Sequence, residues 1–168
     1  MASLYPYVYL AGPGVFRPDA LDWGNRLQAA CIAHGWRGLY PLDGGVPAGL
    51  TKPEQRRWIF NANCKLIRQA DAVLADLRAF RSQSEPDSGT AFEVGYAQAL
   101  GKPVWLCLPT ELQGQDLIAR VGSGQDIAGN AVEDFAAPLN LMLWEAAAGV
   151  VYADEPEAAV AQFAQCFT

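Results

Sequence analysis

Short apolar runs alternate with longer amphipathic segments along almost the whole chain, and this alternation restricts the fold more than any other feature. Apolar runs at 7–12, 36–42, 71–77, 103–108 and 149–153 predict five strands, and the segments between them predict helices. Such an alternation is typical of a parallel sheet with helices on both faces. The sequence therefore predicts a doubly wound α/β fold.

Five helices are predicted between and after these strands, at 19–34, 53–69, 90–100, 138–147 and 155–166. Five parallel strands in this pattern favour the flavodoxin-like order 2-1-3-4-5, whose ligand crevice lies at the carboxyl ends of the first and third strands. A chain of 168 residues, 51% of them hydrophobic, supplies enough apolar surface for one sizeable core. Residues 1–168 are therefore expected to form a single domain.

Charge and composition exclude several kinds of partner. The net charge is -6 at pH 7, whereas nucleic-acid binding draws its affinity from clustered Lys and Arg. No apolar stretch approaches the ~20 residues of a membrane span, and the N-terminal segment MASLYPYVYLAG lacks a basic region followed by a long apolar run. The chain is therefore expected to be cytoplasmic and to bind neither nucleic acid nor membrane.

Cysteine and histidine contribute little candidate chemistry. The four cysteines show no C-x-x-C spacing, and the only histidine, His34, stands just before Gly35 at the predicted end of a helix. We expect no metal site and no organic cofactor. Acid–base and nucleophilic chemistry must then come mainly from carboxylates.

One carboxylate, Glu93, stands among small, apolar and aromatic side chains in the predicted helix 90–100, which is expected to be buried on most sides. A buried carboxylate is costly unless it is paired, hydrogen-bonded or used in chemistry. Thr90 and Glu93 also fit the capping-box spacing, in which both side chains satisfy backbone amides at a helix start. This segment alone is compatible with a structural or a catalytic glutamate.

The predicted strand order gathers several acidic groups in one crevice. It brings together the loop 12–16 after the first strand, Asp76 at the end of the third strand, the loop carrying Asp87, and the start of the helix with Glu93. The G-x-G in the first loop is a fragment of a dinucleotide fingerprint, but an arginine stands where its third glycine belongs. As a phosphate-binding signal this loop is weak.

Five segments carry a resemblance to a known family: VYLAGPGVF, LYPLD, LIRQADAVLADL, PDSGTAFEVGYAQALGKPV and VEDFAAPLNLML. The most specific element is the D-x-G-x-x-x-E stretch from Asp87 to Glu93. The chain resembles the nucleoside 2-deoxyribosyltransferases. The resemblance implies that Glu93 is the nucleophile, that Asp87 holds the sugar hydroxyl and that Tyr9 orients Glu93.

Substrate-binding residues are expected around the same crevice at Gly12, Phe16, Asn63, Asp76 and Gly89. The resemblance also implies that Asn140 and Met142 are lent to the neighbouring subunit's site. The apolar segment 139–144 is consistent with contact to a second subunit. A homo-oligomer with shared active sites is therefore expected.

Asn63 departs from the family pattern, because some members carry an aspartate there that exchanges protons with the base. An amide cannot do this. Asp76 could substitute for it, or hydrogen bonds and water could handle the base. The loops 43–52 and 109–130 are expected to shape the base pocket, and the sequence leaves open whether purines or pyrimidines are preferred.

The expected activity is transfer of 2-deoxyribose between nucleobases, with 2'-deoxynucleosides and free purine or pyrimidine bases as substrates. Displacing a base from the anomeric carbon passes through an oxocarbenium-like state that a carboxylate can trap covalently, and attack of a second base restores the configuration. A deoxynucleoside 5'-monophosphate N-glycosidase is one alternative, although Asp87 would repel a phosphate. A non-catalytic flavodoxin-like nucleotide-binding module is another.

Overall fold

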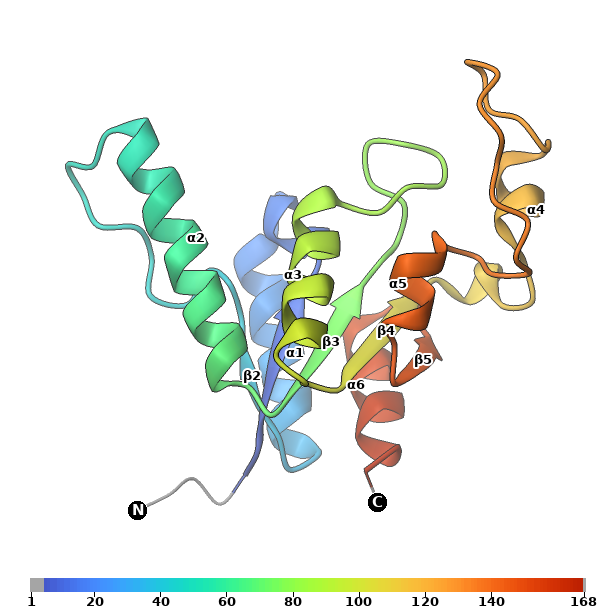
Figure 1. Ribbon diagram of the computed structural model, residues 1–168. Coiled ribbons are helices and arrows are strands. Elements are labelled where there is room, and N and C mark those ends of the chain that lie inside the picture. The colour runs from blue at the N-terminus through green and yellow to red at the C-terminus, as the bar shows by residue number, and fades with distance from the viewer. Residues whose placement is uncertain (1–4, 168) are drawn as a thin grey trace.

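The computed structural model describes residues 5–167 (Figure 1). Its strands are β1 (Tyr7–Ala11), β2 (Arg37–Leu39), β3 (Ala72–Asp76), β4 (Val104–Leu108) and β5 (Gly149–Tyr152). They form a parallel sheet in the order β2-β1-β3-β4-β5, which confirms the predicted doubly wound α/β fold. The first four residues of the N-terminal segment considered above, and the last residue of the predicted domain, lie outside the described residues.

The helices are α1 (Ala20–Ala33), α2 (Lys52–Gln69), α3 (Ser88–Ala99), α4 (Leu117–Val121), α5 (Leu141–Glu145) and α6 (Pro156–Gln165). Two 3-10 turns, η1 (Pro13–Phe16) and η2 (Thr110–Leu112), complete the described elements. Helices α2, α3 and α5 lie on one face of the sheet, and α1 and α6 lie on the other (Figure 1). None of the helices within residues 5–167 combines the length and apolar character needed to cross a membrane.

The side chains of β1 explain why the strands are apolar throughout. Val8 and Leu10 belong to the core cluster that contains residues of α1 and α6, whereas Tyr9 and Ala11 belong to the cluster that contains residues of α2 and α3. All four are buried. Because alternate residues of a strand point to opposite faces, both faces of this sheet are core, and Tyr9 points towards α3.

Two predicted elements are shorter in the structure. The predicted strand 36–42 retains only β2, an edge strand that pairs with β1 alone, because the Asp43 carboxylate accepts a hydrogen bond from the Tyr40 backbone N–H (2.9 Å) and turns the chain. The predicted helix 138–147 retains only α5. Asn140 is its N-cap, with Oδ1 accepting from the Met142 backbone N–H at 3.0 Å.

Helix α3 begins at Ser88, two residues before the predicted start, and Thr90 and Glu93 do not form the capping box that their spacing allows. Asp87 is the N-cap, and its Oδ2 accepts hydrogen bonds from the Thr90 backbone N–H (2.9 Å) and from Thr90 Oγ1 (3.0 Å). Glu93 therefore lies in the second turn of the helix. The positive potential at a helix start falls off within the first turn, so it does little to stabilise the Glu93 charge.

The prediction that this helix is buried on most sides is also wrong: in the isolated chain one side of α3 is exposed. Phe92 is 50% exposed, and Phe60 of α2 beside it is 52% exposed. The Phe92 ring lies 5.7 Å from the Phe60 ring and 5.9 Å from the Tyr96 ring, centroid to centroid. We call these three rings the aromatic patch. An apolar surface of this kind is typical of a contact with another protein surface.

Candidate functional site

A cavity of about 470 Å³ opens beside the carboxyl end of β1, on the α2 and α3 face of the sheet. Its walls come from the loop after β1, the loop between β2 and α2, one side of α2, and the start of α3. Most of the lining is apolar. Asp87 and Glu93 are the charged residues among the described residues that line it.

Glu93 is held through one of its two carboxylate oxygens. Tyr9 Oη donates a hydrogen bond of 2.6 Å to Glu93 Oε1, and Asn63 Nδ2 donates one of 3.3 Å to the same oxygen. Burial raises the pKa of Glu93 to about 7, although the two hydrogen bonds act in the opposite direction. The nearby charge of Asp87 adds to the increase. Burial therefore keeps this carboxyl group protonated to higher pH than an exposed glutamate.

Tyr9 supplies the shorter of these hydrogen bonds from the middle of β1. Its side chain is 0% exposed, and burial together with the neighbouring Glu93 raises its pKa far above the ordinary value. The phenol therefore stays protonated and acts as a hydrogen-bond donor to Glu93. Because the strand is rigid and buried, this contact fixes the position of Oε1 relative to the sheet.

Asp87 lies at the same helix start and also lines the cavity. Gly89 lines it too, and a Cβ atom at this position would lie 3.0 Å from Asp87 Oδ2. A larger residue would therefore crowd the carboxylate. This contact accounts for the glycine in the D-x-G-x-x-x-E stretch.

Gly12 and Phe16 line the cavity from the loop after β1. Gly12 has φ of +150°, and a Cβ atom there would come within 2.8 Å of Asp76 Cβ, so only glycine allows β1 to end this close to β3. Phe16 stacks on Phe80 with ring centroids 5.1 Å apart. The ring is 55% exposed and forms part of the cavity rim.

Asp76 does not line the cavity that contains Glu93, so its expected role as an acid in this crevice is not supported. Its Oδ2 accepts a hydrogen bond of 2.6 Å from Arg78 Nε, and it lines two smaller pockets beside Trp23. The reason is the pleat of β3. Leu74 faces the α1 and α6 side while Ala75 faces α3, so the next residue again points away from Glu93.

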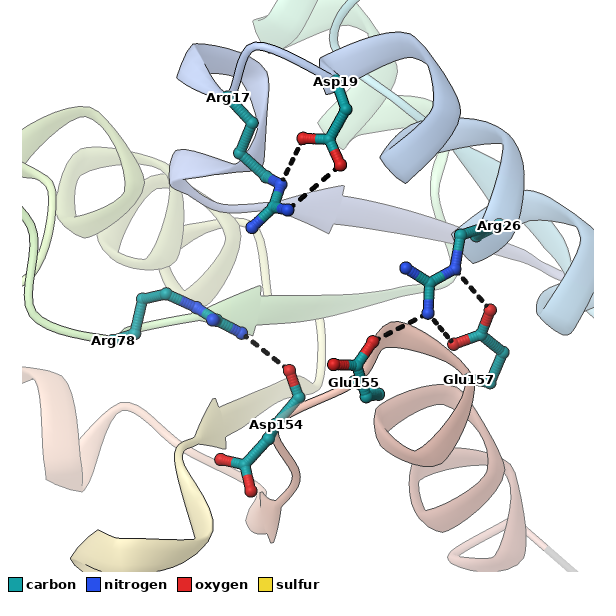
Figure 2. A network of polar contacts seen from close by, with 7 residues as sticks. All are labelled: Arg17, Asp19, Arg26, Arg78, Asp154, Glu155 and Glu157. Atoms are coloured by element: carbon teal, nitrogen blue, oxygen red, sulfur yellow. Dashed lines mark hydrogen bonds and ion pairs between the residues drawn. The ribbon is translucent and has the colours of Figure 1, made fainter.

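The arginines on the α1 and α6 side of the crevice are paired within the chain (Figure 2). Arg17 binds Asp19 at 2.8 Å, Arg26 binds Glu155 and Glu157 at 2.7 Å each, and Arg78 donates to the Asp154 carbonyl at 3.5 Å. These contacts are partly exposed and individually weak. They nevertheless leave the local charge close to balanced, so this cluster does not form an excess positive site.

Asn140 and Met142 are not among the residues that line the cavity of their own chain. Helix α5 packs on α3 on the side away from α2 (Figure 1). Glu133 fixes Asn140, because its Oε1 accepts from Asn140 Nδ2 (2.5 Å) and its Oε2 accepts from the Leu141 backbone N–H (2.8 Å). Met142 is 72% exposed.

Several lining residues were not predicted from the sequence: Leu21 of α1, and Trp58 and Ile59 of α2. Ile59 could have been found, since it stands four residues before Asn63 and so shares its helix face. The loop 43–52 contributes to the cavity as expected, through Gly45 and Val46. The loop 109–130 does not line the described cavity. No group of three or more His, Cys, Asp or Glu within residues 5–167 is arranged to hold a metal ion.

Known proteins are similar to this chain in sequence and in fold. The chain is 35% identical to a 2-deoxyribosyltransferase from Leishmania mexicana, with a TM-score of 0.74 over 95% of this chain and 97% of that chain. An uncharacterized protein from Schizosaccharomyces pombe is 39% identical over 101 residues, 59% of this chain. The chain covers 48% of the length of that curated relative. A CMP N-glycosidase from Clostridium botulinum shares the fold alone, at 14% identity and a TM-score of 0.51 over 96% and 99% of the two chains.

The sequence profile described as nucleoside 2-deoxyribosyltransferase matches residues 8–142, which include all of β1 but its first residue, the cavity walls described above and α3. The chain belongs to the nucleoside 2-deoxyribosyltransferase family. The family and the Leishmania structure together support an enzyme of the deoxyribosyltransferase class.

Proposed function

We propose that this protein transfers 2-deoxyribose from a 2'-deoxynucleoside to a free purine or pyrimidine base through a covalent intermediate on Glu93. The observation that carries this proposal is a carboxylate held by Tyr9 and Asn63 at the wall of a largely apolar cavity. The cavity volume of about 470 Å³ is in the range of small-molecule sites. No cofactor takes part in the proposed reaction.

In the first half-reaction, ionised Glu93 attacks the anomeric carbon of the donor nucleoside. The bond from that carbon to the base nitrogen breaks, its electron pair leaves with the base, and the departing base takes up a proton. The new bond joins a Glu93 oxygen to the sugar. A 2-deoxy sugar favours this step, because no 2-hydroxyl withdraws electron density from the oxocarbenium-like state.

In the second half-reaction, a different base occupies the vacated face of the sugar. Its nitrogen attacks the anomeric carbon, the ester bond to Glu93 breaks, and the carboxylate is regenerated as the incoming base loses its proton. Two displacements on the same carbon retain its configuration. Water in place of the second base would give free 2-deoxyribose.

Asp87 serves as the proposed contact for a sugar hydroxyl. Its hydrogen bonds from Thr90 both end on Oδ2, which leaves Oδ1 to accept a hydrogen bond from the substrate. This contact lies in the same cavity as Glu93 and would help to place the anomeric carbon for attack.

A nucleotide substrate is disfavoured by the charges of the cavity. Both charged groups among its described lining residues are carboxylates, and neither Lys nor Arg is among them. Among these lining residues a 5'-phosphate would find no cationic partner, and Asp87 and Glu93 would repel it. We therefore favour base exchange on nucleosides over hydrolysis of deoxynucleoside monophosphates.

Each active site is proposed to be shared by two copies of the chain. Asn140 and Met142 do not line the cavity of their own chain, and the exposed aromatic patch provides an apolar surface for a second copy. In this proposal the second copy also supplies its Asn140 to the cavity that contains Glu93. Placement of the protein in the cytoplasm also remains a prediction.

Base exchange can be tested directly by chromatography. Purified protein is incubated with deoxyinosine or thymidine and a panel of free bases, in phosphate-free buffer. We expect a new deoxynucleoside that contains the added base. Release of free sugar at a rate independent of the added base would indicate a hydrolase instead. Unchanged substrates with every base would favour a binding module.

Replacing Asp87 by serine separates its two roles. Serine is as good an N-cap as aspartate, so the thermal midpoint should change little, whereas loss of the carboxylate should lower kcat/KM by roughly 10- to 100-fold. Asp87→Ala should lose the cap as well and cost about 0.5–2 kcal/mol of stability. Steady-state kinetics and thermal unfolding of both variants check this. A change in base preference alone would show that Asp87 contacts the base rather than the sugar.

A further inference from the structure

The two hydrogen bonds to Glu93 end on the same atom. Tyr9 Oη lies 2.6 Å from Oε1 and Asn63 Nδ2 lies 3.3 Å from it, and they come from opposite elements of the cavity wall, β1 and α2. An oxygen that accepts two hydrogen bonds is less nucleophilic and less free to move than its neighbour. The geometry therefore distinguishes the two oxygens of the carboxylate.

Asn63 makes this contact without an evident benefit to the fold. Its Oδ1 is buried and has no hydrogen-bond partner among the described residues. A buried carbonyl without a partner is destabilising compared with an apolar group of the same shape. The amide is therefore explained by what its NH₂ group does for Glu93 rather than by packing.

We propose that Asn63 is a positioning residue that, together with Tyr9, holds Glu93 Oε1 so that Oε2 attacks the anomeric carbon. This inference rests on the proposed function. It also assigns Asn63 a different role from the base-directed acid that some family members place here: the amide donates to the nucleophile while adding no charge beside it. In this arrangement Asn63 does not protonate the departing base.

An aspartate at position 63 would harm this arrangement. Glu93 is already surrounded by the Tyr9 phenol, the Cys64 thiol and the Asp87 carboxylate, none of which is cationic. A second carboxylate about 3 Å away would share one proton with Glu93. Two carboxylates this close do not both ionise readily, so the pair would keep one proton to higher pH and Glu93 would be available for attack only in more alkaline buffer.

The test compares Asn63→Asp with Asn63→Leu, which has nearly the same shape but neither charge nor donor. For the wild-type protein we expect kcat/KM to rise with pH up to about pH 7, as Glu93 ionises. In Asn63→Asp this rise should move to higher pH, with activity at pH 7 falling about 10-fold for each unit of displacement and recovering in alkaline buffer. The pH profile is the readout that a purely structural role would not change.

Asn63→Leu should lose roughly 10- to 100-fold in kcat, the effect of one hydrogen bond to a charged group, and its thermal midpoint should not fall. Wild-type activity in Asn63→Leu, or an unshifted and undiminished pH profile in Asn63→Asp, would overturn the inference while leaving the proposed function intact. Faster release of purines by Asn63→Asp would show that residue 63 acts on the base, which would also overturn the inference. A wild-type protein that performs neither exchange nor hydrolysis would refute the proposed function itself.

Discussion

Replacing Glu93 by glutamine is expected to abolish base exchange, with a loss of at least about 10⁴-fold, the scale on which removal of a covalent nucleophile acts. Glutamine retains an oxygen that can accept the hydrogen bonds of Tyr9 and Asn63, so the shape of the site should persist. The remaining binding contacts cannot replace the missing bond to the sugar. Single-turnover assays with radiolabelled donor nucleoside would measure the loss.

The same variant should be more stable than the wild-type protein at alkaline pH. Burial raises the pKa of Glu93 from its ordinary value of 4.5 to about 7, so between these values the folded state binds more protons than the unfolded state. Stability therefore falls as pH rises through this window. Glu93→Gln removes the ionisation and should gain on the order of 1–3 kcal/mol at pH 8 and almost nothing at pH 4.5.

Thermal unfolding at the two pH values measures this difference, since about 1 kcal/mol corresponds to roughly 2–4 °C in a chain of this size. Glu93→Ala is the companion variant, which also removes the acceptor of both hydrogen bonds. A well-folded Glu93→Ala protein with near-normal exchange would show that Glu93 is a structural residue and not the nucleophile. Equal gains in stability at both pH values would show that the effect of glutamine does not come from charge.

The fold could be predicted because both faces of the sheet are buried. The five strands therefore appear as separate apolar runs, and the helices between them leave few topologies for a parallel sheet. Strand and helix ends were less predictable. Asp87 and Thr90 are both good N-cap residues, and the sequence does not show that Asp87 caps α3 while Thr90 serves as its hydrogen-bond donor.

The sequence indicated the location of those site residues that stand at a strand end or in the D-x-G-x-x-x-E motif. Glu93, Asp87 and Asn63 line one cavity, and Tyr9 contacts Glu93. Asp76 was misplaced because β3 is apolar on both faces, so no polar alternation reveals which side its last residue faces. The roles of these residues in catalysis stay predictions.

The contact of Glu133 with Asn140 could not be predicted from the local sequence pattern. Glu133 stands seven residues before Asn140, in a segment without regular structure, and its carboxylate holds both Asn140 and the first amide of α5. Neither a helical nor a strand period brings these two side chains together. Only the path of the loop does so, and single-sequence propensities do not determine that path.

The shared-site proposal predicts that two inactive variants restore activity when they are mixed. Each site takes Glu93 from one chain and Asn140 from the other, so a heterodimer of Glu93→Ala and Asn140→Ser contains one doubly damaged site and one intact site. Serine is chosen because it can still cap α5 while it lacks the amide donor. Each variant should fail alone, and the co-expressed pair should regain exchange.

The expected recovery follows from mixing. If the chains pair without preference, half of the dimers are mixed and each carries one intact site, which gives about one quarter of wild-type activity. The matched control pairs Glu93→Ala with Asp87→Ala. Both residues line the same cavity of one chain, so no arrangement of these two variants contains an intact site and no recovery is expected.

Recovery in the first pair but not in the second would place Asn140 across the interface from Glu93, because only residues supplied by different chains can complement each other in this way. Sedimentation of the wild-type protein and of the mixed sample must show an oligomer for the comparison to hold. A monomeric wild-type enzyme that is active, or proven mixed oligomers without recovery, would refute the shared site. Since Asn140 does not line its own cavity, such a result would also remove it from the catalytic residues.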